Sequence, residues 1–360
     1  MNIGELRQRQ SLPLEMKIQK SIRVIEEYYE KYDGDVYISR GGVDSAVVAW
    51  LAQQSIYKDR IENVSIASCE PVENTRLNKS DGVTLLKSET GKIEVIEKWG
   101  YPLISKQVAM SISRYARTKH NWVKERRLNG YMGRNGKVIM DGSIPKKYQG
   151  LIYAPFELSE KCCDVTKKNP LKKYEKKSKK YPITGEMASE SRLREQEYLK
   201  HGCIMHDKKR PKCTPIGFWT DQDVKECVIR YGIKISELYG EVVEEKKDDK
   251  VLLKFSGEQR SGCEICSFGI MFDKERFERM KKNKPNMYNY MMRGGKWIRK
   301  ELYRWVKFRP NSMPIWSNLY FVPSKEGFGY KFVLNYFYEL MGINRKEEIL
   351  KWDIYGNEIK

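Results

Sequence analysis

The sequence predicts an α/β protein with a mainly parallel sheet, helices on both faces of that sheet, and a basic helical C-terminal extension. Short β-branched segments alternate with longer segments of helical periodicity, which is typical of parallel strands joined by helices. A pair of glycines follows the first of these strands and precedes an apolar helix. The 360 residues are 40% hydrophobic, enough for one large domain with an extension or for two domains.

The individual elements follow from apolar spacing and from turn and cap residues. Leu14, Ile18, Ile22 and Ile25 share one face of a helix expected over residues 14–32. Strands are expected at residues 35–39, 63–68, 93–97 and 182–187. Further helices are expected at residues 45–54, 106–118 and 221–231, with Thr220 capping the last of them. The charged stretch 241–250 is expected to be a surface loop or linker.

The chain is strongly basic, with 68 lysines and arginines against 48 acids and a net charge of +20. Such an excess favours an anionic partner, and a solvated basic surface is the alternative. No run of 18 apolar residues is present, so no membrane contact is expected. Residues 1–10 are polar and do not resemble a secretory signal, which predicts a cytoplasmic location.

Two segments concentrate the positive charge, residues 167–180 and residues 281–309. The second segment also carries aromatic residues between its cations, namely Tyr288, Tyr290, Trp297, Tyr303 and Trp305. Cations follow a phosphate backbone and aromatic rings stack on bases, so this mixture predicts binding of single-stranded or distorted nucleic acid. The alternative is that the aromatic residues pack a helical core and leave the cations on its wet face.

The segment Ser39-Arg-Gly-Gly-Val-Asp-Ser45 predicts a phosphate-binding loop. Gly41 and Gly42 allow the backbone to turn tightly and to approach a ligand. Their N–H groups, together with the N-terminus of the next helix, would form a nest for phosphate. Asp44 would hold a cation or order the loop, and Ser45 would cap the helix or donate to phosphate. The alternative is an ordinary strand–turn–helix connection.

The clustering of cysteines predicts a metal site. Cys162 and Cys163 are adjacent, and Cys263 and Cys266 are separated by two residues. Four thiolates suit an iron–sulfur cluster or a structural zinc ion, and adjacent cysteines fit a zinc site less well. The alternative to both is that these are core cysteines without a metal. Cys203 is a reserve ligand that would replace Cys162 or Cys163. The remaining cysteines are expected to be small buried residues: Cys69, Cys213 and Cys227.

The loop from Ser39 to Ser45 resembles the S-G-G-x-D-S loop of the P-loop-like ATP pyrophosphatases. That family includes phosphoadenosine-phosphosulfate (PAPS) reductases, tRNA-thiolating enzymes and DNA phosphorothioation enzymes. The resemblance implies an adenine nucleotide bound across a parallel sheet, ATP with Mg²⁺ as the cofactor, and cleavage between the α and β phosphates. Arg40 stands at the first Ser of the pattern, and its planar fork would still meet phosphate. Val43 stands where Lys is common.

Three later segments resemble sulfonucleotide reductases. Residues 161–171 are similar to a C-C-x-x-x-K-x-x-P-L segment whose cysteines, with a later C-x-x-C, hold a 4Fe–4S cluster. The segment 184–194 is similar to a substrate segment, T-G-x-x-x-x-x-S-x-x-R, in which Ser191 and Arg194 match and Arg194 would contact phosphate or sulfate. The segment 215–224 is similar to P-L-x-x-W-T-x-x-D-V. The family's terminal E-C-G-x-H is absent, since no cysteine follows Cys266.

Together these features predict three segments: an N-terminal helix at 1–34, a nucleotide-binding domain with the cysteine cluster at 35–280, and a basic extension at 281–360. The expected function is ATP-dependent adenylation of an acceptor followed by sulfur transfer, with Asp44 and Arg194 as catalytic residues. Nucleic acid is favoured as the acceptor, and a sulfur-donor protein is an expected partner. The alternatives are sulfonucleotide reduction with an unusual thiol, and a non-catalytic nucleotide-sensing or nucleic-acid-binding protein. By resemblance to phosphorothioation enzymes, a role in phage or anti-phage biology is also expected.

Overall fold

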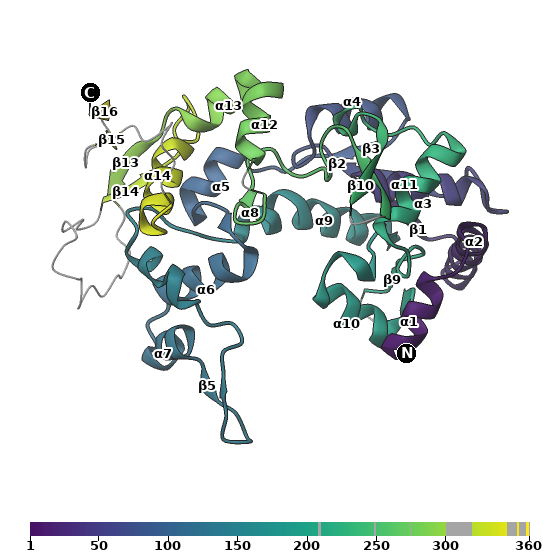
Figure 1. The fold of residues 1–360 in the computed structure, drawn as a ribbon, viewed down its shortest axis with the longest axis horizontal. Helices are drawn as coiled ribbons and strands as arrows, with labels where there is room; N and C mark the ends of the chain where they lie inside the picture. The colour runs from purple at the N-terminus through teal and green to yellow at the C-terminus, as the bar shows by residue number, and fades with distance from the viewer. Residues whose placement is uncertain are drawn as a thin grey trace. The chain divides into compact units, whose positions relative to one another are not determined.

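The computed structural model describes residues 1–207, 210–247, 250–273, 275–299, 319–343, 351–352 and 358–359 (Figure 1). The chain divides into two compact units, each built from two stretches of sequence. Unit 1 comprises Met1–Ser88 and Lys167–Glu264, and unit 2 comprises Glu89–Thr166 and Ile265–Lys360. These units differ from the three expected segments, because the N-terminal helices pack into the core of unit 1 and because the chain leaves unit 1 and returns to it.

Unit 1 is built around a six-stranded sheet with the strand order β3-β2-β1-β7-β9-β8 (Figure 1). Each neighbouring pair is parallel except β8 with β9. The strands are β1 (Val36–Arg40), β2 (Glu62–Ile66), β3 (Thr84–Leu86), β7 (Tyr181–Ile183), β8 (Ile204–Met205) and β9 (Lys212–Cys213). The expected α/β fold with a mainly parallel sheet is therefore confirmed.

The other regular elements of unit 1 are helices and one hairpin. They are α1 (Ile3–Gln10), α2 (Leu14–Lys31), α3 (Val43–Gln53), α4 (Val72–Ser80), α9 (Asn169–Ser178), α10 (Arg192–His201), α11 (Asp221–Tyr231), β10 (Val242–Lys247) and β11 (Lys250–Phe255). Short 3-10 turns lie at Ala188–Glu190 and Glu237–Tyr239.

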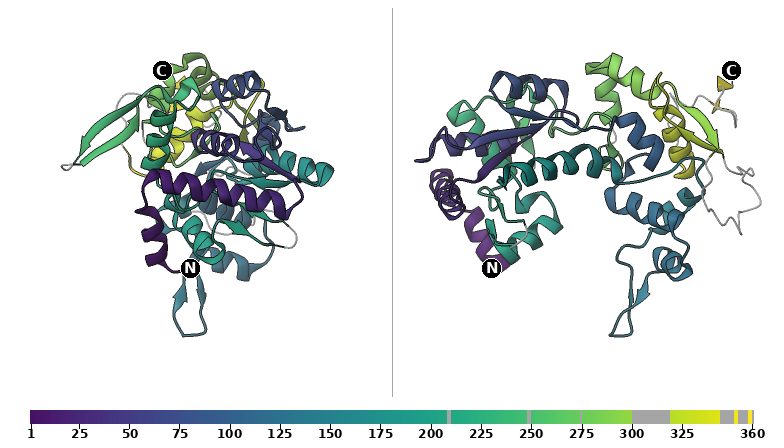
Figure 2. Two further views of the ribbon diagram at one scale, coloured as in Figure 1. Left: turned by 90° about the vertical axis from the view of Figure 1, so that its right-hand side faces the viewer. Right: turned by 180° about the vertical axis from the view of Figure 1, so that it is seen from behind.

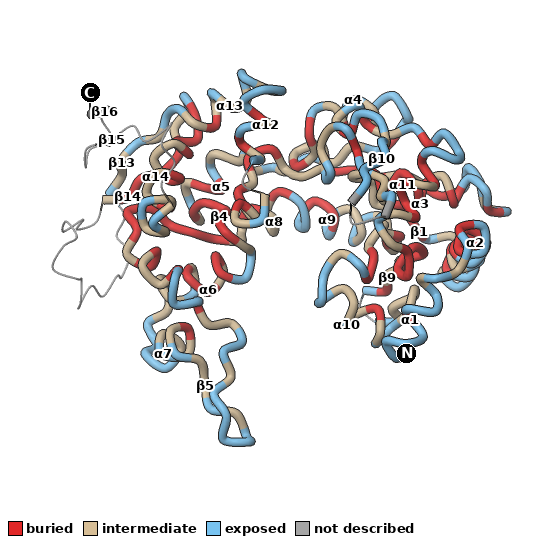
Figure 3. Tube along the Cα trace, in the orientation of Figure 1, coloured by how far each residue is buried: buried red, intermediate tan, exposed pale blue. Residues whose placement is uncertain are grey.

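Strand β1 is covered by helices on both faces, because successive side chains of a strand point in opposite directions. Val36 and Ile38 belong to one core, which they share with buried residues of α2, α3 and α11. Tyr37 belongs to a second core, where it packs edge-on against Tyr174 and lies near Leu171, both on α9. Figure 3 shows the buried residues gathered along these central elements.

Several elements agree with the sequence-based expectations. In α2 the predicted apolar face of Leu14, Ile18, Ile22 and Ile25 is buried. Helix α11 begins after Thr220, whose hydroxyl accepts a hydrogen bond from the backbone of the third helical residue, as expected for a cap. The helix expected over residues 106–118 is α6 (Lys106–Arg117).

Three expectations about strands and loops are wrong. Residues 93–97 lie in helix α5 (Lys92–Trp99) rather than in a strand, and β3 is the third strand. The successive residues Val95 and Ile96 are both buried, which a helix allows and an alternating strand does not. The strand expected over 182–187 ends at Ile183. In the charged stretch 241–250, Val242–Lys247 form β10, which pairs antiparallel with β11 (Lys250–Phe255), because backbone pairing tolerates exposed charged side chains.

Unit 2 contains mostly helices and short strand pairs around an aromatic core. Its elements are α5, α6, α7 (Asn121–Asn129), α8 (Lys161–Cys163), α12 (Arg276–Asn283), α13 (Pro285–Met292), α14 (Tyr330–Leu340) and the strand pairs β4 (Leu103–Ile104) with β12 (Ser267–Phe268), β5 (Tyr131–Met132) with β6 (Val138–Ile139), and β13 (Lys296–Arg299) with β14 (Leu319–Val322). A further backbone pair joins β15 (Lys351–Trp352) and β16 (Glu358–Ile359). Among the helices that the structure describes, none is long and apolar enough to cross a membrane.

The aromatic residues of the basic extension pack within unit 2 where they are described. Tyr290 lies edge-on against Phe328, and Trp297 contacts the rings of Phe321 and Phe332. These contacts favour the core-packing interpretation for Tyr290 and Trp297. The ring centroid of Tyr288 lies 5.8 Å from Nζ of Lys281. The remaining two aromatic residues considered for base stacking, at positions 303 and 305, lie outside the described residues.

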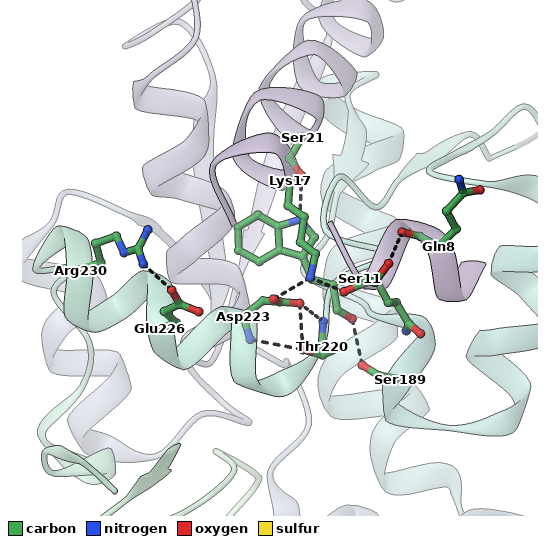
Figure 4. A network of polar contacts seen from close by, with 11 residues as sticks. Gln8, Ser11, Lys17, Ser21, Ser189, Thr220, Asp223, Glu226 and Arg230 are labelled. Atoms are coloured by element: carbon green, nitrogen blue, oxygen red, sulfur yellow. Dashed lines mark hydrogen bonds and ion pairs between the residues drawn. The ribbon is translucent and has the colours of Figure 1, made fainter. Parts of the chain in front are cut away.

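A buried ion pair joins the N-terminal helices to the cap of α11 in unit 1 (Figure 4). The Nζ of Lys17, which is 2% exposed, lies 2.7 Å from Oδ1 of Asp223 and 2.6 Å from the carbonyl oxygen of Gln10. The other oxygen of Asp223 accepts hydrogen bonds from the amide and hydroxyl of Thr220. The carboxylate of Asp223 therefore neutralises the buried Lys17 and also stabilises the N-terminus of α11 through Thr220.

We expect Asp223→Ala to lower the free energy of unfolding by about 3–5 kcal/mol, because it leaves the Lys17 ammonium buried without a counter-charge. The control is Glu226→Ala, which removes the partner of Arg230 in a half-exposed pair on the same helix. That control should cost less than about 1 kcal/mol. Urea titration of both variants measures the difference, and equal midpoints would contradict the assigned role of Asp223.

Candidate functional site

The candidate site in unit 1 begins where β1 ends. Arg40 is the last residue of the strand, and Gly42 is the cap residue of α3. The amide of Gly41 donates to Oγ of Ser45 (2.7 Å), and the Ser45 hydroxyl donates to the carbonyl of Gly42 (2.8 Å). Ser45 thus closes the loop on itself, whereas the cap residue of α3 is Gly42, which makes no side-chain cap hydrogen bond. Ser39 lies inside β1, paired in register with Val64 of β2.

Gly42 is required by the close packing around the loop. A Cβ at this position would collide with the hydroxyl oxygens of Ser261 and Tyr239. The Tyr239 hydroxyl also accepts a hydrogen bond from the amide of Val43 (3.0 Å). The backbone that follows β7 is equally close, since a Cβ on Gly185 would lie 2.8 Å from the amide nitrogen of Ser45. The loop is therefore held from both sides by backbone and hydroxyl groups.

A small recess, open to solvent, adjoins the loop in unit 1. It is lined by Arg40, Gly41, Gly42, Asn74, Ser236 and Tyr239, among others. The side-chain amide of Asn74 donates to the carbonyl of Gly41 and to Glu70, while its buried oxygen has no hydrogen-bond partner among the described residues. Buried polar atoms normally have a partner, so this pocket offers an acceptor suited to a bound polar ligand.

Arg40 places a largely buried cation beside the loop. Its side chain is 10% exposed, and its guanidinium lies 3.7 Å from the carboxylate of Asp81. Burial lowers the pKa of Arg40, and the nearby Asp81 opposes that shift. The S-G-G-x-D-S pattern has a serine where this chain has Arg40. This position therefore carries a positive charge here, which suits an anionic ligand.

The Asp44 side chain is partly buried and lies near charges of both signs. The pKa of Asp44 is raised to about 6, mainly by burial and also by the charge of Asp221, against the opposing effects of Arg194 and Arg260. The structure thus brings Arg194, expected from the substrate segment, close enough to act on Asp44. Arg260 was not foreseen, although its position shortly before the Cys263 pair is a visible clue in the sequence. Carboxyls with perturbed pKa values are frequent at functional sites.

Ser191 and Arg194 lie together at the start of α10. The Ser191 hydroxyl caps this helix by accepting from the amide of Arg194, and the Arg194 side chain pairs with Glu190. Arg194 also lines a second pocket of unit 1, of about 320 Å³, with Lys212 and His201. The Arg194 side chain is 38% exposed, and its charge lowers the pKa of Asp44.

The four candidate metal ligands are divided between the units. Cys162, Cys163 and Cys266 belong to unit 2, and Cys263 lies in the last residues of unit 1. Within unit 2, burial raises the pKa of Tyr330, and the thiols of Cys162 and Cys266 add to this shift, which places both near its hydroxyl. Among the described residues no group of three or more histidine, cysteine or acidic side chains is arranged to hold a metal ion.

The backbone around the adjacent cysteines is irregular. Helix α8 contains Cys162 and Cys163 and continues into a π-helical turn at Asp164–Lys168. The hydroxyl of Thr166 donates to the carbonyl of Cys162 (2.8 Å), which satisfies one of the carbonyls at this irregularity. Such π-helical turns often lie at functional sites. Cys203 is largely buried in unit 1, where burial raises its pKa to about 11.

One family profile and one solved structure are similar to this chain. The sequence profile of the phosphoadenosine phosphosulfate reductase domain matches residues 35–267. The crystal structure of the PAPS reductase from Candida auris, a phosphate complex, is similar at 10% sequence identity and a TM-score of 0.35, covering 63% of this chain and 91% of that chain. None of the curated proteins matches the sequence. Because the profile spans more than half of the chain, the protein belongs to the phosphoadenosine phosphosulfate reductase domain family.

Proposed function

We propose that the protein is an ATP-binding enzyme that adenylates an acceptor and transfers sulfur to it. The observation that carries this proposal is the partly buried Asp44 carboxyl, which lies in the first turn of α3, after the Gly41–Gly42 turn at the carboxyl end of β1, and whose pKa is lowered by the nearby charges of Arg194 and Arg260. In open α/β sheets, ligands bind beyond the carboxyl ends of the strands, where the strand order reverses. Here β1 has β2 on one side and β7 on the other.

Each residue of the loop has a distinct task in this proposal. The backbone amides of the turn and the first turn of α3 would hold the phosphates of ATP. Arg40 and Arg194 would balance their negative charge, and Asp44 would hold Mg²⁺. An acceptor oxygen would then attack the α-phosphorus and release pyrophosphate. A sulfur nucleophile from a donor protein would displace AMP from the acceptor.

The net charge of +20 favours nucleic acid as the acceptor. Lys172, Lys173, Lys176 and Lys177 on α9 are all exposed, so they are accessible to a phosphate backbone. The wider proposal therefore places the protein near the DNA phosphorothioation enzymes, with a role in phage or anti-phage biology. The partners are an adenine nucleotide, nucleic acid and a sulfur-donor protein.

A metal centre forms part of the same proposal. Cys162, Cys163, Cys263 and Cys266 would hold a 4Fe–4S cluster, with zinc as the alternative metal, since thiolates are suitable ligands for both. The proximity of Cys162 and Cys266 to Tyr330 and the irregular backbone at Asp164–Lys168 support this choice of ligands. A bound cluster would supply electron-transfer or sulfur-binding chemistry.

Sulfonucleotide reduction is a second candidate, and the match to the reductase family favours it. That reaction needs a nucleophilic thiolate, and no cysteine follows Cys266 in this sequence. Release of sulfite from PAPS in the presence of thioredoxin would support this candidate over adenylation. A nucleotide sensor is favoured instead if ATP binds but no pyrophosphate is released with any acceptor.

We expect ATP to raise the melting temperature, because a ligand that binds only the folded state stabilises it, by about 2.7 kcal/mol at 100 times its Kd. Asp44→Ala and Gly42→Val should abolish this response, the second because a side chain at Gly42 collides with Ser261 and Tyr239. The control is Gly91→Val, since a Cβ at Gly91 would meet no described atom within 4 Å and the φ there is an ordinary −68°. An unchanged melting temperature with ATP, AMP and adenosine phosphosulfate would refute the phosphate-loop assignment.

Binding of Mg²⁺-ATP should weaken as the pH falls through about 6, because Asp44 with a pKa of about 6 becomes neutral there and loses its attraction for Mg²⁺. Calorimetry on wild type and Asp44→Asn, at pH values about one unit above and below that pKa, tests this claim. The titration of the nucleotide itself is common to both proteins, so the comparison isolates Asp44. Equal pH dependence in the two proteins would contradict the assignment.

Anaerobically purified protein should be brown, with broad absorbance from thiolate-bound iron. Cys263→Ser or Cys266→Ser should bleach the colour and lower the iron content. The matched control is Cys227→Ser, which changes a fully buried cysteine of α11 that is not a proposed ligand. Colourless protein that contains one zinc ion would show that the site holds zinc and not a cluster. Protein without any metal would refute the metal site.

A further inference from the structure

We propose that residues 114–147 of unit 2, called here the basic wing, form a docking surface for double-stranded nucleic acid. The basic wing contains the end of α6, helix α7 and the β5–β6 hairpin. Residues 118–120 form the whole connection between the two helices, and the hairpin follows α7 directly. A connection of this length occurs in helix-turn-helix DNA-binding motifs, which place the second helix in the major groove.

The basic wing carries ten lysines and arginines against two acids, Glu125 and Asp141. The hairpin contributes Arg134 and Lys137, both exposed, at its tip. Figures 1 and 2 show this hairpin projecting from the rest of unit 2. Among the described residues, neither tip cation has an ion-pair partner. The excess of exposed positive charge on a projecting element complements a phosphate backbone.

Three arginines gather at the base of the basic wing. Burial lowers the pKa of Arg127, and the charges of Arg114 and Arg126 lower it further, against the opposing effect of Asp141. The Nε atoms of Arg126 and Arg127 are buried without a hydrogen-bond partner in the part of the chain that the structure describes. Like charges held together beside unpaired donors are costly in the free protein, and a bound anion such as phosphate would relieve that cost.

The helix and the hairpin are held together as one surface. The guanidinium of Arg126 stacks 4.0 Å from the ring centroid of Tyr131, the first residue of β5. Nη1 of Arg127 donates to the carbonyl of Gly142 (2.6 Å), just beyond the hairpin. Gly130 makes the turn between the elements at φ +76°, where a side chain would collide with the carbonyl of Ile139. These contacts fix the angle at which the hairpin leaves α7.

Helix α7, which is described over its full length, contributes little to the core of unit 2. Its one buried residue is Arg127, whereas a surface helix normally buries an apolar stripe. Its Trp122 is 66% exposed, and Met132 and Val138 of the hairpin are 67% and 56% exposed. Figure 3 shows exposed and intermediate residues along most of this region. Apolar side chains beside cations suit base edges in a groove, where they contact thymine methyl groups.

A duplex fits these features better than a single strand. The major groove admits an α-helix or a two-stranded ribbon, and the basic wing presents one of each with cations at the tip of the ribbon. The inference rests on the proposed function for the choice of nucleic acid as the acceptor. Its test, however, measures binding in the absence of ATP and of any sulfur donor.

Fluorescence anisotropy with a labelled duplex of about 30 base pairs, at about 50 and 200 mM salt, measures the affinity and its salt dependence. Arg134→Ala with Lys137→Ala should weaken binding and reduce the slope of log K against log salt by about two, because two phosphate contacts are lost. Lys20→Ala with Arg23→Ala, two exposed cations of α2, is the control with the same change in net charge. The slope of that control should equal the wild-type slope.

Trp122→Ala tests the helix separately, since its exposed side chain adds little to stability. It should weaken duplex binding while leaving the melting temperature unchanged. Wild-type slopes in the hairpin variant, tighter binding of the matched single strand, or no duplex binding at about 50 mM salt would each overturn the inference. Duplex binding that depends on the basic wing, without pyrophosphate release, would instead reject adenylation and leave the docking surface in place.

Discussion

The burial of β1 on both faces is the constraint on which unit 1 depends. Val36 and Ile38 bind one helical layer and Tyr37 the other, so the strand cannot slip by one residue without exchanging its two faces. Its last residue therefore has a fixed position, and so does the turn that follows. Tyr239 and Ser261 then close around Gly42 and leave no freedom for that turn. The position of the candidate site is therefore fixed by the packing of the core.

The charges around the turn show a second constraint. The Arg40 side chain is 10% exposed and Asp44 is partly buried, and neither has a close, well-aligned ion-pair partner among the described residues. Burial acts against both charged forms, raising the pKa of the acid and lowering that of the base. A core built for stability alone would place apolar side chains at these positions. Their presence is consistent with a ligand that brings its own charge, as a metal-bound nucleotide does.

Local sequence patterns were sufficient to predict the central fold. The face of α2, the cap of α11 and the loop after β1 each depend on residues within one or two turns of one another, so spacing and residue type predict them. The helix at Lys92–Trp99 was predicted as a strand because a short run with β-branched residues fits the periodicity of a helix as well as that of a strand. The β10–β11 hairpin was missed because its pairing is made by the backbone, while its side chains resemble those of a charged loop.

The candidate site was only partly predictable for the same reason. Arg40, Gly42 and Asp44 are nearly contiguous, and the motif identifies them together. Arg260, Tyr239 and Ser261 approach the turn from residues far along the chain, and only tertiary structure brings them there. The assignment of the cysteines as metal ligands also depends on contacts between residues far apart in the sequence. Spacing suggests the ligands, but their placement around a metal is a property of the folded chain.

The division of unit 1 into two stretches has a consequence for biosynthesis. Strand β1 pairs with β7, and the first segment of unit 2 lies between them in sequence. The sheet therefore cannot be completed during synthesis until the ribosome has made that intervening segment as well. Pairing over such a long separation is slow, because the loop must close before the contact forms. Until β7 is made, the edge of β1 that will pair with it stays open. Unpaired strand edges with apolar residues are prone to aggregation.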